Sequence, residues 1–315
     1  MKLSQAVHDY IALKQSLGSR FHTGATILKA FCKALGEVAI VDVEPHRVSS
    51  YLAGSAPVTR HWHRKYEALS GFYRFALGRA YVLNSPLPAT VPKRPQPFRP
   101  YIYSQEELRN IIKAAGEYET PRTALEKATL RTLLLLLYGA GLRIGEALAL
   151  THADVDLDTA LLTIRESKFY KTRLVPLGPR LTAVLRTYAD DRYQRAHSNN
   201  SAAAFFVTRT GTAVTRGQAE RAFVRLRDIA GIVREDNARY QPRLHDLRHS
   251  MAVHRLVAWY REGADVQRLL PQLATYLGHV DVSATQRYLT MTPDLLREAS
   301  QRFERYAQPE EVHHE

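Results

Sequence analysis

A tyrosine and several cationic side chains are spread over the second half of this 315-residue chain, and their types suit attack on a phosphodiester. Such a reaction needs positive charge beside the nonbridging phosphate oxygens, because the transition state places more charge on them. Arginine meets this need, since its planar guanidinium bonds two oxygens and stays protonated at any working pH. A tyrosine hydroxyl can act as the nucleophile and form a covalent phosphoester. The candidate groups are Arg143, Lys168, His245, Arg248, His279 and Tyr288.

The sequence around these groups predicts the elements that position them. Arg143 follows two glycines that end one apolar helix and precedes the apolar run of another, so we expect it in a tight turn between helices. Lys168 lies between residues 161–164 and 173–177, two short runs typical of hairpin strands. It is therefore expected near the turn of a β-hairpin. The competing cations on this hairpin are Arg165, Lys171 and Arg173.

The remaining candidates lie closer to the C-terminus. His245 and Arg248 are three residues apart, so a helix presents them on one face. His279 directly follows a glycine, and Tyr288 comes nine residues later. Each residue by itself also fits a structural role. Arg143 could cap helix carbonyls, His279 could cap a helix, and Tyr288 is one of 17 tyrosines.

The order and the flanking residues of these groups resemble those of the tyrosine recombinases of the phage integrase and Xer class. The motifs of this resemblance cover roughly residues 104 to 300, and the N-terminal region is similar more loosely, in size and helical character. Any one box is weak evidence, but five boxes in the family order make coincidence very improbable. The matched boxes are Gly141-Leu142-Arg143 with Glu146, Lys168 ahead of Val175-Pro176-Leu177, His245-Asp246-Leu247-Arg248-His249, Leu277-Gly278-His279, and Tyr288.

The resemblance implies a role for each group. Arg143 and Arg248 would flank the scissile phosphate, and His245 and His279 would donate further hydrogen bonds to it. Tyr288 would form a phosphotyrosyl ester that conserves the energy of the broken bond, so neither ATP nor a cofactor is expected.

Proton transfer and support add three further assignments. Lys168 is the general acid that the resemblance implies for the leaving 5′-hydroxyl. His245 is the better candidate for accepting the proton of Tyr288, because a neutral imidazole is available near pH 7. Glu146, one turn beyond Arg143, is expected to orient one of the basic groups.

A zinc site is the competing interpretation of the histidines. His245 and His249 have the spacing of a helical zinc pair, but Asp246 stands where the protease motif has Glu, and spacing places no third ligand. We therefore expect no metal, and a structural place for His249 beside Arg248. The single cysteine, Cys32, excludes an internal disulfide and a cysteine-cluster zinc site.

Length and charge limit the classes of function. A chain of 315 residues suggests about two domains. The 44 Lys and Arg against 31 Asp and Glu give a net charge of +13, which favours a polyanionic partner such as nucleic acid; charge that serves solubility alone is the alternative. Residues 1–10 carry no apolar signal core, and the apolar run 133–142 is far shorter than the roughly 20 residues of a membrane span. We therefore expect a cytoplasmic protein without a membrane partner.

The spacing of apolar residues predicts a mainly α fold with a small antiparallel β-sheet (α+β). Residues 1–85 predict a small helical domain, with helices over 3–17, 23–35, 44–52 and 58–77, and the resemblance implies that it is a core-DNA-binding domain. Residues 86–103 are rich in proline and basic side chains and predict a semi-rigid linker. Residues 104–291 form the predicted catalytic domain, in which residues 203–208 are expected to add a third strand.

Basic residues outside the catalytic set are candidates for DNA contacts. The resemblance implies that the two domains clamp a duplex, which would bring cations of the fourth helix, the linker and the hairpin to phosphates. An ordinary helix with solvated charges and an uninvolved spacer are the alternatives. The candidates are His61, Arg64, Lys65, Arg74, Lys93, Arg94, Arg99, Lys171 and Arg173.

Residues 292–315 are expected to form a C-terminal helix and tail. Thr292 can cap this helix, Pro293 suits its first position, and an apolar stripe follows. The stripe could pack on its own domain, whereas the resemblance implies exchange of the helix into a neighbouring protomer. The resemblance further implies a homotetramer on two DNA sites, each with an inverted-repeat core, and a monomer or weak oligomer when free.

The expected function is that of a site-specific DNA recombinase. Such an enzyme cleaves and rejoins duplex DNA through a 3′-phosphotyrosyl intermediate, in integration, excision, resolution or transposition. The alternatives are a noncatalytic DNA-binding architectural protein of the same fold and a DNA-relaxing enzyme similar to type IB topoisomerases. The complete set of six groups argues against the first alternative, because an inert protein has no need of all of them.

Overall fold

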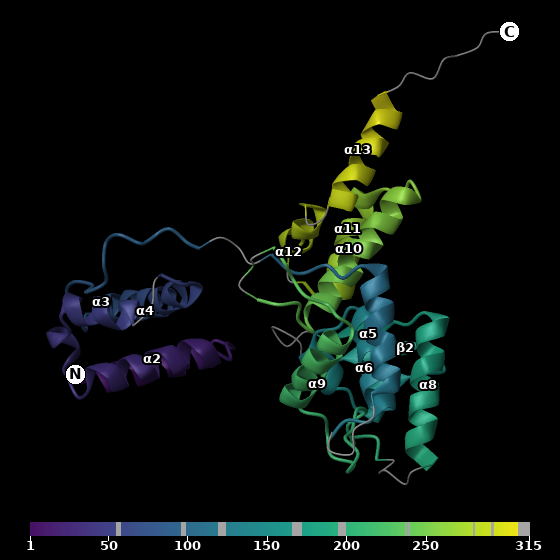
Figure 1. Ribbon diagram of the computed structural model, residues 1–315. Coiled ribbons are helices and arrows are strands. Elements are labelled where there is room, and N and C mark those ends of the chain that lie inside the picture. Colours follow the sequence, from purple (N-terminus) through teal and green to yellow (C-terminus); the bar gives the residue numbers. More distant parts are fainter. Residues whose placement is uncertain are drawn as a thin grey trace. The chain divides into compact units, whose positions relative to one another are not determined.

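The computed structural model describes residues 1–54, 58–95, 99–118, 124–165, 172–194, 200–236, 238, 240–279, 281–290 and 293–307. The chain divides into two compact units, Met1–Phe98 and Arg99–Glu315, each with a hydrophobic core of its own (Figure 1). The division falls inside the predicted linker, residues 86–103.

The first unit is helical, and its four predicted helices are confirmed to within two residues at either end. Its elements are α1 (Leu3–Ser16), α2 (His22–Leu35), the 3-10 helix η1 (Ile40–Asp42), α3 (Pro45–Ala53) and α4 (Arg60–Gly78). The Thr59 hydroxyl accepts a hydrogen bond from the backbone N–H of His61 and so caps α4. Leu28 and Phe31 of α2 are buried in one core with Leu69 of α4, which holds the helices together.

The second unit contains nine α-helices, two 3-10 helices and three strands within its described residues. The helices before the sheet are α5 (Gln105–Glu117), α6 (Lys127–Gly139), α7 (Ile144–Leu148) and η2 (His152–Asp154). The strands are β1 (Val155–Asp156), β2 (Leu161–Ile164) and β3 (Arg173–Pro176). The later helices are α8 (Pro179–Gln194), α9 (Arg216–Ile229), α10 (Asp246–Arg261), α11 (Val266–Leu277), α12 (Ser283–Gln286), η3 (Arg287–Thr290) and α13 (Pro293–Ala307).

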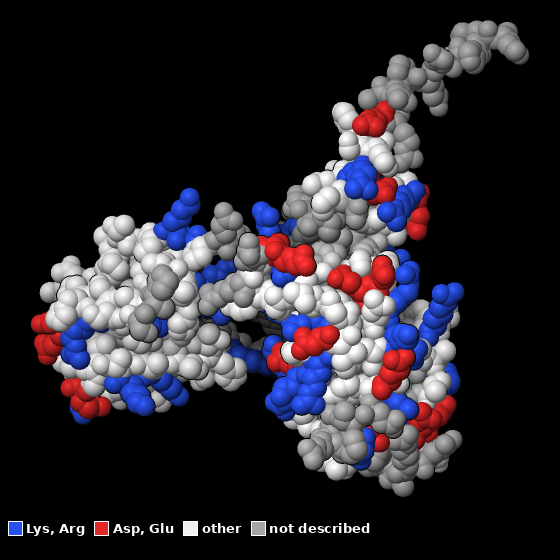
Figure 2. Space-filling view, viewed as in Figure 1, with Lys and Arg blue, Asp and Glu red and all other residues white. Residues whose placement is uncertain are grey.

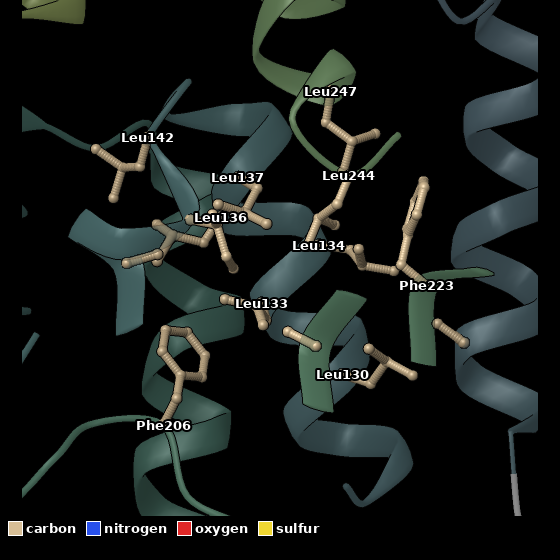
Figure 3. Packing of buried hydrophobic residues seen from close by; sticks show 14 of the residues in the cluster. Leu130, Leu133, Leu134, Leu136, Leu137, Leu142, Phe206, Phe223, Leu244 and Leu247 are labelled. Atoms are coloured by element: carbon tan, nitrogen blue, oxygen red, sulfur yellow. The ribbon is translucent and has the colours of Figure 1, made fainter. Parts of the chain in front are cut away.

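Helix α6 forms the centre of this unit's core. It packs against α5, α8 and α10, and five of its leucines, among them Leu133 and Leu134, are buried (Figure 3). Each such side chain contributes about 2 kcal/mol by leaving water. Phe223 of α9 and Leu247 of α10 belong to the same core. The apolar run that precedes Arg143 in the sequence is therefore a buried helix, as predicted.

The start of the second unit is fixed to α10. The Ser104 hydroxyl accepts from Glu107 N while the Glu107 carboxylate accepts from Ser104 N, so a capping box begins α5. One residue earlier, the N–H of Tyr103 donates to the buried Ser250 Oγ at 2.8 Å. The chain therefore enters this unit at a defined position on α10.

The three strands form an antiparallel sheet in the order β1-β2-β3. Leu162 pairs with Val155 on one side and with Val175 on the other, and Ile164 pairs with Arg173. The predicted hairpin is thus present, and it directs Leu162 and Val175 into the core. The residues between β2 and β3, 166–171, lie outside the described part.

The predicted third strand over 203–208 is wrong, and β1 takes that place in the sheet. The segment makes only the isolated bridges Thr151 with Ala204 and Val207 with Ala213. Two of its carbonyls are bonded by a side chain, because the buried Arg192 guanidinium donates to Ala204 O at 3.0 Å and also to Phe205 O. The segment therefore crosses the core without a partner strand.

Helix α13 packs on α10 of its own chain. Leu295 is buried there, and Arg261 Nε donates to Glu298 Oε1 at 2.8 Å. Leu296 and Phe303 remain 52% and 73% exposed. The helix is thus docked along one side and open along another. No helix in the described ranges has the length and apolar character that a membrane span requires.

Candidate active site

The turn that carries Arg143 depends on a glycine. Gly141 has φ +60, and a Cβ there would lie 2.0 Å from the Met251 Cε of α10 and 3.0 Å from Leu277 of α11. Only glycine satisfies both the positive φ and the close contact. Arg143 follows at the N-terminus of α7, where its backbone N–H donates to Glu146 Oε2 at 3.0 Å. The predicted inter-helix turn is therefore present.

Glu146 binds two arginines from different elements. Arg143 Nη1 donates to Oε1 at 2.6 Å, and Arg173 of β3 donates to both carboxylate oxygens, at 3.1 and 2.8 Å. Burial alone would raise the pKa of Glu146, but the hydrogen bonds from Arg173 and Arg143 outweigh burial and lower the pKa to about 2. The carboxylate is therefore ionised at neutral pH and fixes the positions of both guanidinium groups.

Arg248 on α10 is held by main-chain oxygens. Its side chain is 2% exposed, Nη1 donates to Gly141 O at 2.6 Å, and Nη2 donates to Leu277 O. Glu146 Oε2 is 3.9 Å from Nη1. Burial and the neighbouring Arg143 lower the pKa of Arg248 to about 10, so the guanidinium remains protonated at neutral pH. Its positive charge is thus placed at the Arg143 turn.

The C-terminus of α11 brings the same groups together. Gly278 ends the helix with φ +64, and its carbonyl accepts from Arg143 Nη2 at 3.0 Å. A Cβ at this position would lie 2.6 Å from Arg173 Nη1, so a larger residue would displace Arg173. Gly278 therefore allows Arg143 and Arg173 to approach the C-terminus of α11.

The three histidines of the site are neutral at pH 7. Burial lowers the pKa of His245 and of His279 to about 4, and the charge of Arg248 adds to this effect. Burial and the nearby His245 lower the pKa of His249 to about 3. His279 Nδ1 shares a hydrogen bond of 2.6 Å with the buried Thr285 hydroxyl, which fixes the ring.

Tyr288 lies on η3 with its side chain directed into this cluster. It is 3% exposed, and its ring stacks on that of His279 with centroids 6.1 Å apart. Burial raises the pKa of Tyr288, although the charge of Arg248 opposes the rise, so the phenol is protonated at neutral pH. Tyr288 Oη and His249 Nδ1 are 3.0 Å apart and share a hydrogen bond.

The sequence predicts His245 as the acceptor of the Tyr288 proton and therefore as the neighbour of the Tyr288 hydroxyl. The structure puts His249 there, and the two imidazoles contact each other edge to face with centroids 4.9 Å apart. His249 stands four residues after His245, so both lie on one face of α10. The four-residue spacing of the two histidines is visible in the sequence and suggests a zinc pair there. It does not show that His249 contacts Tyr288.

The predicted DNA contacts differ in their surroundings, and Lys168 and Lys171 lie outside the described residues. Lys65 Nζ donates to Tyr51 O at 2.7 Å and lies over the Tyr51 ring, so its charge is turned toward its own unit. Arg94 forms an exposed ion pair with Glu67. Lys and Arg side chains are visible on the surface of each unit (Figure 2). The exposed candidates are His61, Arg64, Arg74, Lys93, Arg94 and Arg99.

Arg173 does not occupy the position expected of a DNA contact. Its side chain is 10% exposed, its two terminal nitrogens bond Glu146, and its Nε donates to Tyr276 O at 3.1 Å. All three guanidinium nitrogens of Arg173 are thus bonded inside the protein. Its place is that of a support for Glu146 and, through it, for Arg143. Among the described residues, no group of three His, Cys, Asp or Glu side chains is placed to hold a metal.

Comparison with known proteins gives the site a family context. The model of the phage integrase family matches residues 103–294. The chain is 37% identical over 311 residues to a Sinorhizobium fredii protein that carries the name integrase/recombinase y4rB, and the alignment covers 96% of each chain. It is 32% identical over 241 residues to the tyrosine recombinase XerC of Oceanobacillus iheyensis, covering 75% of this chain and 72% of XerC.

A solved structure shows the same fold. The lambda integrase tetramer bound to a Holliday junction superposes with a TM-score of 0.64 and 18% identity, and the match covers 90% of this chain and 79% of the integrase. The mainly helical fold with a small antiparallel sheet is therefore confirmed.

Proposed function

Because the chain belongs to the phage integrase family and is a tyrosine-type site-specific DNA recombinase, we propose that Tyr288 is its nucleophile and forms a 3′-phosphotyrosyl intermediate. The observation that carries the proposal is the meeting of two guanidinium groups with one phenol. Arg143 donates to the carbonyl of Gly278 at the end of α11, and Arg248 donates to the carbonyl of Gly141 in the turn before Arg143. The charge of Arg248 is close enough to Tyr288 to oppose the rise in the pKa of the phenol.

The proposed step is an in-line exchange of oxygens at phosphorus. The Tyr288 oxygen bonds phosphorus as the bond to the 5′-oxygen breaks, and in the same step the phenol gives its proton to the neutral imidazole of His245. Arg143 and Arg248 stabilise the charge that develops on the nonbridging oxygens. Lys168 gives a proton to the departing 5′-oxygen, and a 5′-hydroxyl from the other DNA strand reverses the reaction to reseal the backbone. The number of phosphoester bonds is unchanged, so no ATP is needed.

The histidines of the site would respond to the substrate. His245 and His279 are neutral in the free protein because burial and Arg248 lower the pKa of each. An entering phosphate brings negative charge and therefore raises both pKa values again. We propose that each donates a hydrogen bond to the phosphate, and that Glu146, through Arg143 and Arg173, supports the array.

The proposed partner is double-stranded DNA with an inverted-repeat core site, acted on in the cytoplasm during integration, excision, resolution or transposition. A net charge of +13 and exposed cations such as Arg64 and Arg74 support binding to a polyanion. Affinity should fall as salt rises, because contacts to phosphates release counterions. We propose a tetramer on two DNA sites that forms from monomers or weak oligomers, with the exposed Leu296 and Phe303 of α13 facing a neighbouring protomer.

Covalent trapping tests the role of Tyr288. In a DNA substrate nicked beside the scissile phosphate, the short strand with the new 5′-hydroxyl diffuses away and the protein–DNA adduct accumulates. The wild-type protein should form this adduct and Tyr288→Phe should not. Tyr138→Phe is the matched control, because Tyr138 is also a tyrosine hydrogen-bonded to a histidine of α10, at 2.9 Å from His254, but lies outside the site.

Three outcomes would contradict the proposal. An adduct that persists in Tyr288→Phe removes the assignment of the nucleophile. Salt-dependent binding without adduct on any cognate site favours an architectural protein. Relaxation of supercoiled plasmid by the monomer, without preference for a site, favours a topoisomerase-like enzyme.

A further inference from the structure

The hydroxyl of Tyr288 has a specific neighbour before any DNA is bound. Tyr288 Oη and His249 Nδ1 are 3.0 Å apart, and the ring centroids lie 5.6 Å apart. His249 projects from α10 and follows Arg248 directly, whereas Tyr288 belongs to η3, 39 residues later. The two rings are thus joined across separate elements, and α10 carries both the phosphate-binding arginine and the partner of the phenol.

The protonation states decide what this hydrogen bond can do. At pH 7 the imidazole is neutral and the phenol is protonated, as derived above. A phenol that donates its O–H to Nδ1 keeps both lone pairs of its oxygen available, whereas a phenol that accepts from the ring uses one of them. With the ring proton on Nε2, the phenol is the donor, so its oxygen is fixed and still able to attack phosphorus.

We propose that His249 is a positioning residue for the nucleophile: it accepts the hydrogen bond of the Tyr288 phenol and holds this oxygen in place for attack. The proposal rests on the proposed function, in which Tyr288 attacks the phosphate. It is separate from the roles of His245 and His279, whose proposed partner is the phosphate. A reacting oxygen that is misplaced by about 1 Å can cost about 100-fold in rate, so such a residue has a large effect on cleavage.

Helix α10 offers a matched control. His254 Nδ1 and Tyr138 Oη share a hydrogen bond of 2.9 Å, again between a histidine of α10 and a tyrosine of another helix. Burial lowers the pKa of His254 and raises that of Tyr138, as it does for the pair in the site. Substitution of His254 therefore measures the effect of breaking such a bond on this helix without touching Tyr288.

The test compares His249→Ala, His249→Asn and His254→Ala on the nicked DNA substrate. For each full-length variant, the dissociation constant for DNA and the single-turnover rate of adduct formation are measured. His249→Ala should slow adduct formation by about 10- to 100-fold, with a dissociation constant within about twofold of wild type. His249→Asn should recover most of the rate, because a side-chain amide places an acceptor near the position of Nδ1. His254→Ala should retain the wild-type rate.

Two results would overturn the proposal. The first is a wild-type rate in His249→Ala, which leaves the hydrogen bond without a role in cleavage. The second is an asparagine variant as slow as the alanine variant, which would mean that the reaction needs the imidazole as a proton acceptor and not as a fixed partner.

A measurement on the DNA-free protein separates this inference from the proposed function. With selective ¹⁵N labelling of histidine, the Nδ1 resonance of His249 should shift in Tyr288→Phe and stay unchanged in Tyr138→Phe. An unchanged resonance in both variants contradicts the hydrogen bond itself. If wild-type protein forms no adduct, the proposed function fails and takes the positioning role with it. If wild type and His249→Ala form adduct equally, the inference alone fails.

Discussion

At the scale of single residues, one carboxylate organises a site made of cations. Glu146 accepts from the Arg143 side chain and backbone and from both terminal nitrogens of Arg173. Its spacing from Arg143 is readable in the sequence, since three residues separate an N-cap from the side chain that bonds it. Arg173 is not readable in this way, because its approach depends on how the hairpin folds back on α7.

We predict that Glu146→Gln destabilises the protein by roughly 3 kcal/mol at pH 7, because the guanidinium of Arg173 loses its anionic partner in a site with little water. The pKa of Glu146 is lowered from 4.5 to about 2 in the folded protein, so the carboxylate stabilises the fold above pH 4.5 and loses this effect as pH falls toward 2. The difference between wild type and variant should therefore shrink by roughly 2 kcal/mol between pH 7 and pH 3.

Urea denaturation at the two pH values measures this difference. Glu220→Gln is the control, since Glu220 pairs with Arg216 on the surface of α9 and should change stability by no more than about 0.5 kcal/mol. A difference that stays constant from pH 7 to pH 3 would contradict the depressed pKa of Glu146.

The element scale adds a steric requirement. The turn between α6 and α7 touches α10 and α11, so the peptide that carries the Gly141 oxygen is fixed by packing as well as by φ. The sequence predicts this turn, because two glycines follow an apolar helix. It predicts the third strand in the wrong place, since residues 203–208 have strand composition, whereas Arg192 bonds the carbonyls of Ala204 and Phe205 and the third strand is β1. The spacing of apolar residues cannot reveal that an arginine side chain takes the backbone oxygens that a neighbouring strand would otherwise bind.

Gly141→Ala should lower the free energy of unfolding by about 3 kcal/mol and reduce adduct formation, since it adds an overlap with Met251 to the strain of a positive φ. Gly263→Ala is the matched control: Gly263 has φ +71 but nothing within 4 Å of its Cβ position, so strain alone should cost about 1 kcal/mol.

A double-mutant cycle with Met251→Ala separates the two causes. In the Met251→Ala background the overlap with Met251 is gone and the 3.0 Å approach to Leu277 remains, so the cost of Gly141→Ala should fall toward the roughly 1 kcal/mol expected at Gly263. An equal cost of Gly141→Ala in both backgrounds, measured by denaturant unfolding, would show that contact with Met251 plays no part.

At the scale of the whole molecule, α13 connects the stability of one chain with its assembly. One side of the helix is bound within the chain through Leu295 and Glu298, and another exposes Leu296 and Phe303, seven residues apart on one face. The sequence predicts the helix and its apolar stripe. The sequence does not show which apolar residues of α13 pack on their own chain and which remain exposed. Apolar spacing identifies the face that is buried but not the partner that buries it.

We predict that the double variant Leu296→Asp with Phe303→Asp keeps the wild-type stability to within about 0.5 kcal/mol, since both side chains are exposed. It should bind a single DNA site and form the covalent adduct, but lose joined products between two sites. Gln301→Asp is the control and should recombine normally, because Gln301 is an exposed position on the same helix that is turned away from Leu296 and Phe303. Full recombination by the double variant, measured as joined product from two labelled duplexes, would contradict a role of this face in assembly.

Arg248 illustrates how such a site can persist while its sequence changes. Its two hydrogen-bond acceptors are the peptide oxygens of residues 141 and 277, which every amino acid supplies. Substitution at either position cannot delete an acceptor; it can only move one. An arginine held by a carboxylate would instead be lost in function through a single change of its partner. The partners of Arg248 are therefore lost only through substitutions that move these two peptides, as Gly141→Ala should, and not through a change of a partner side chain.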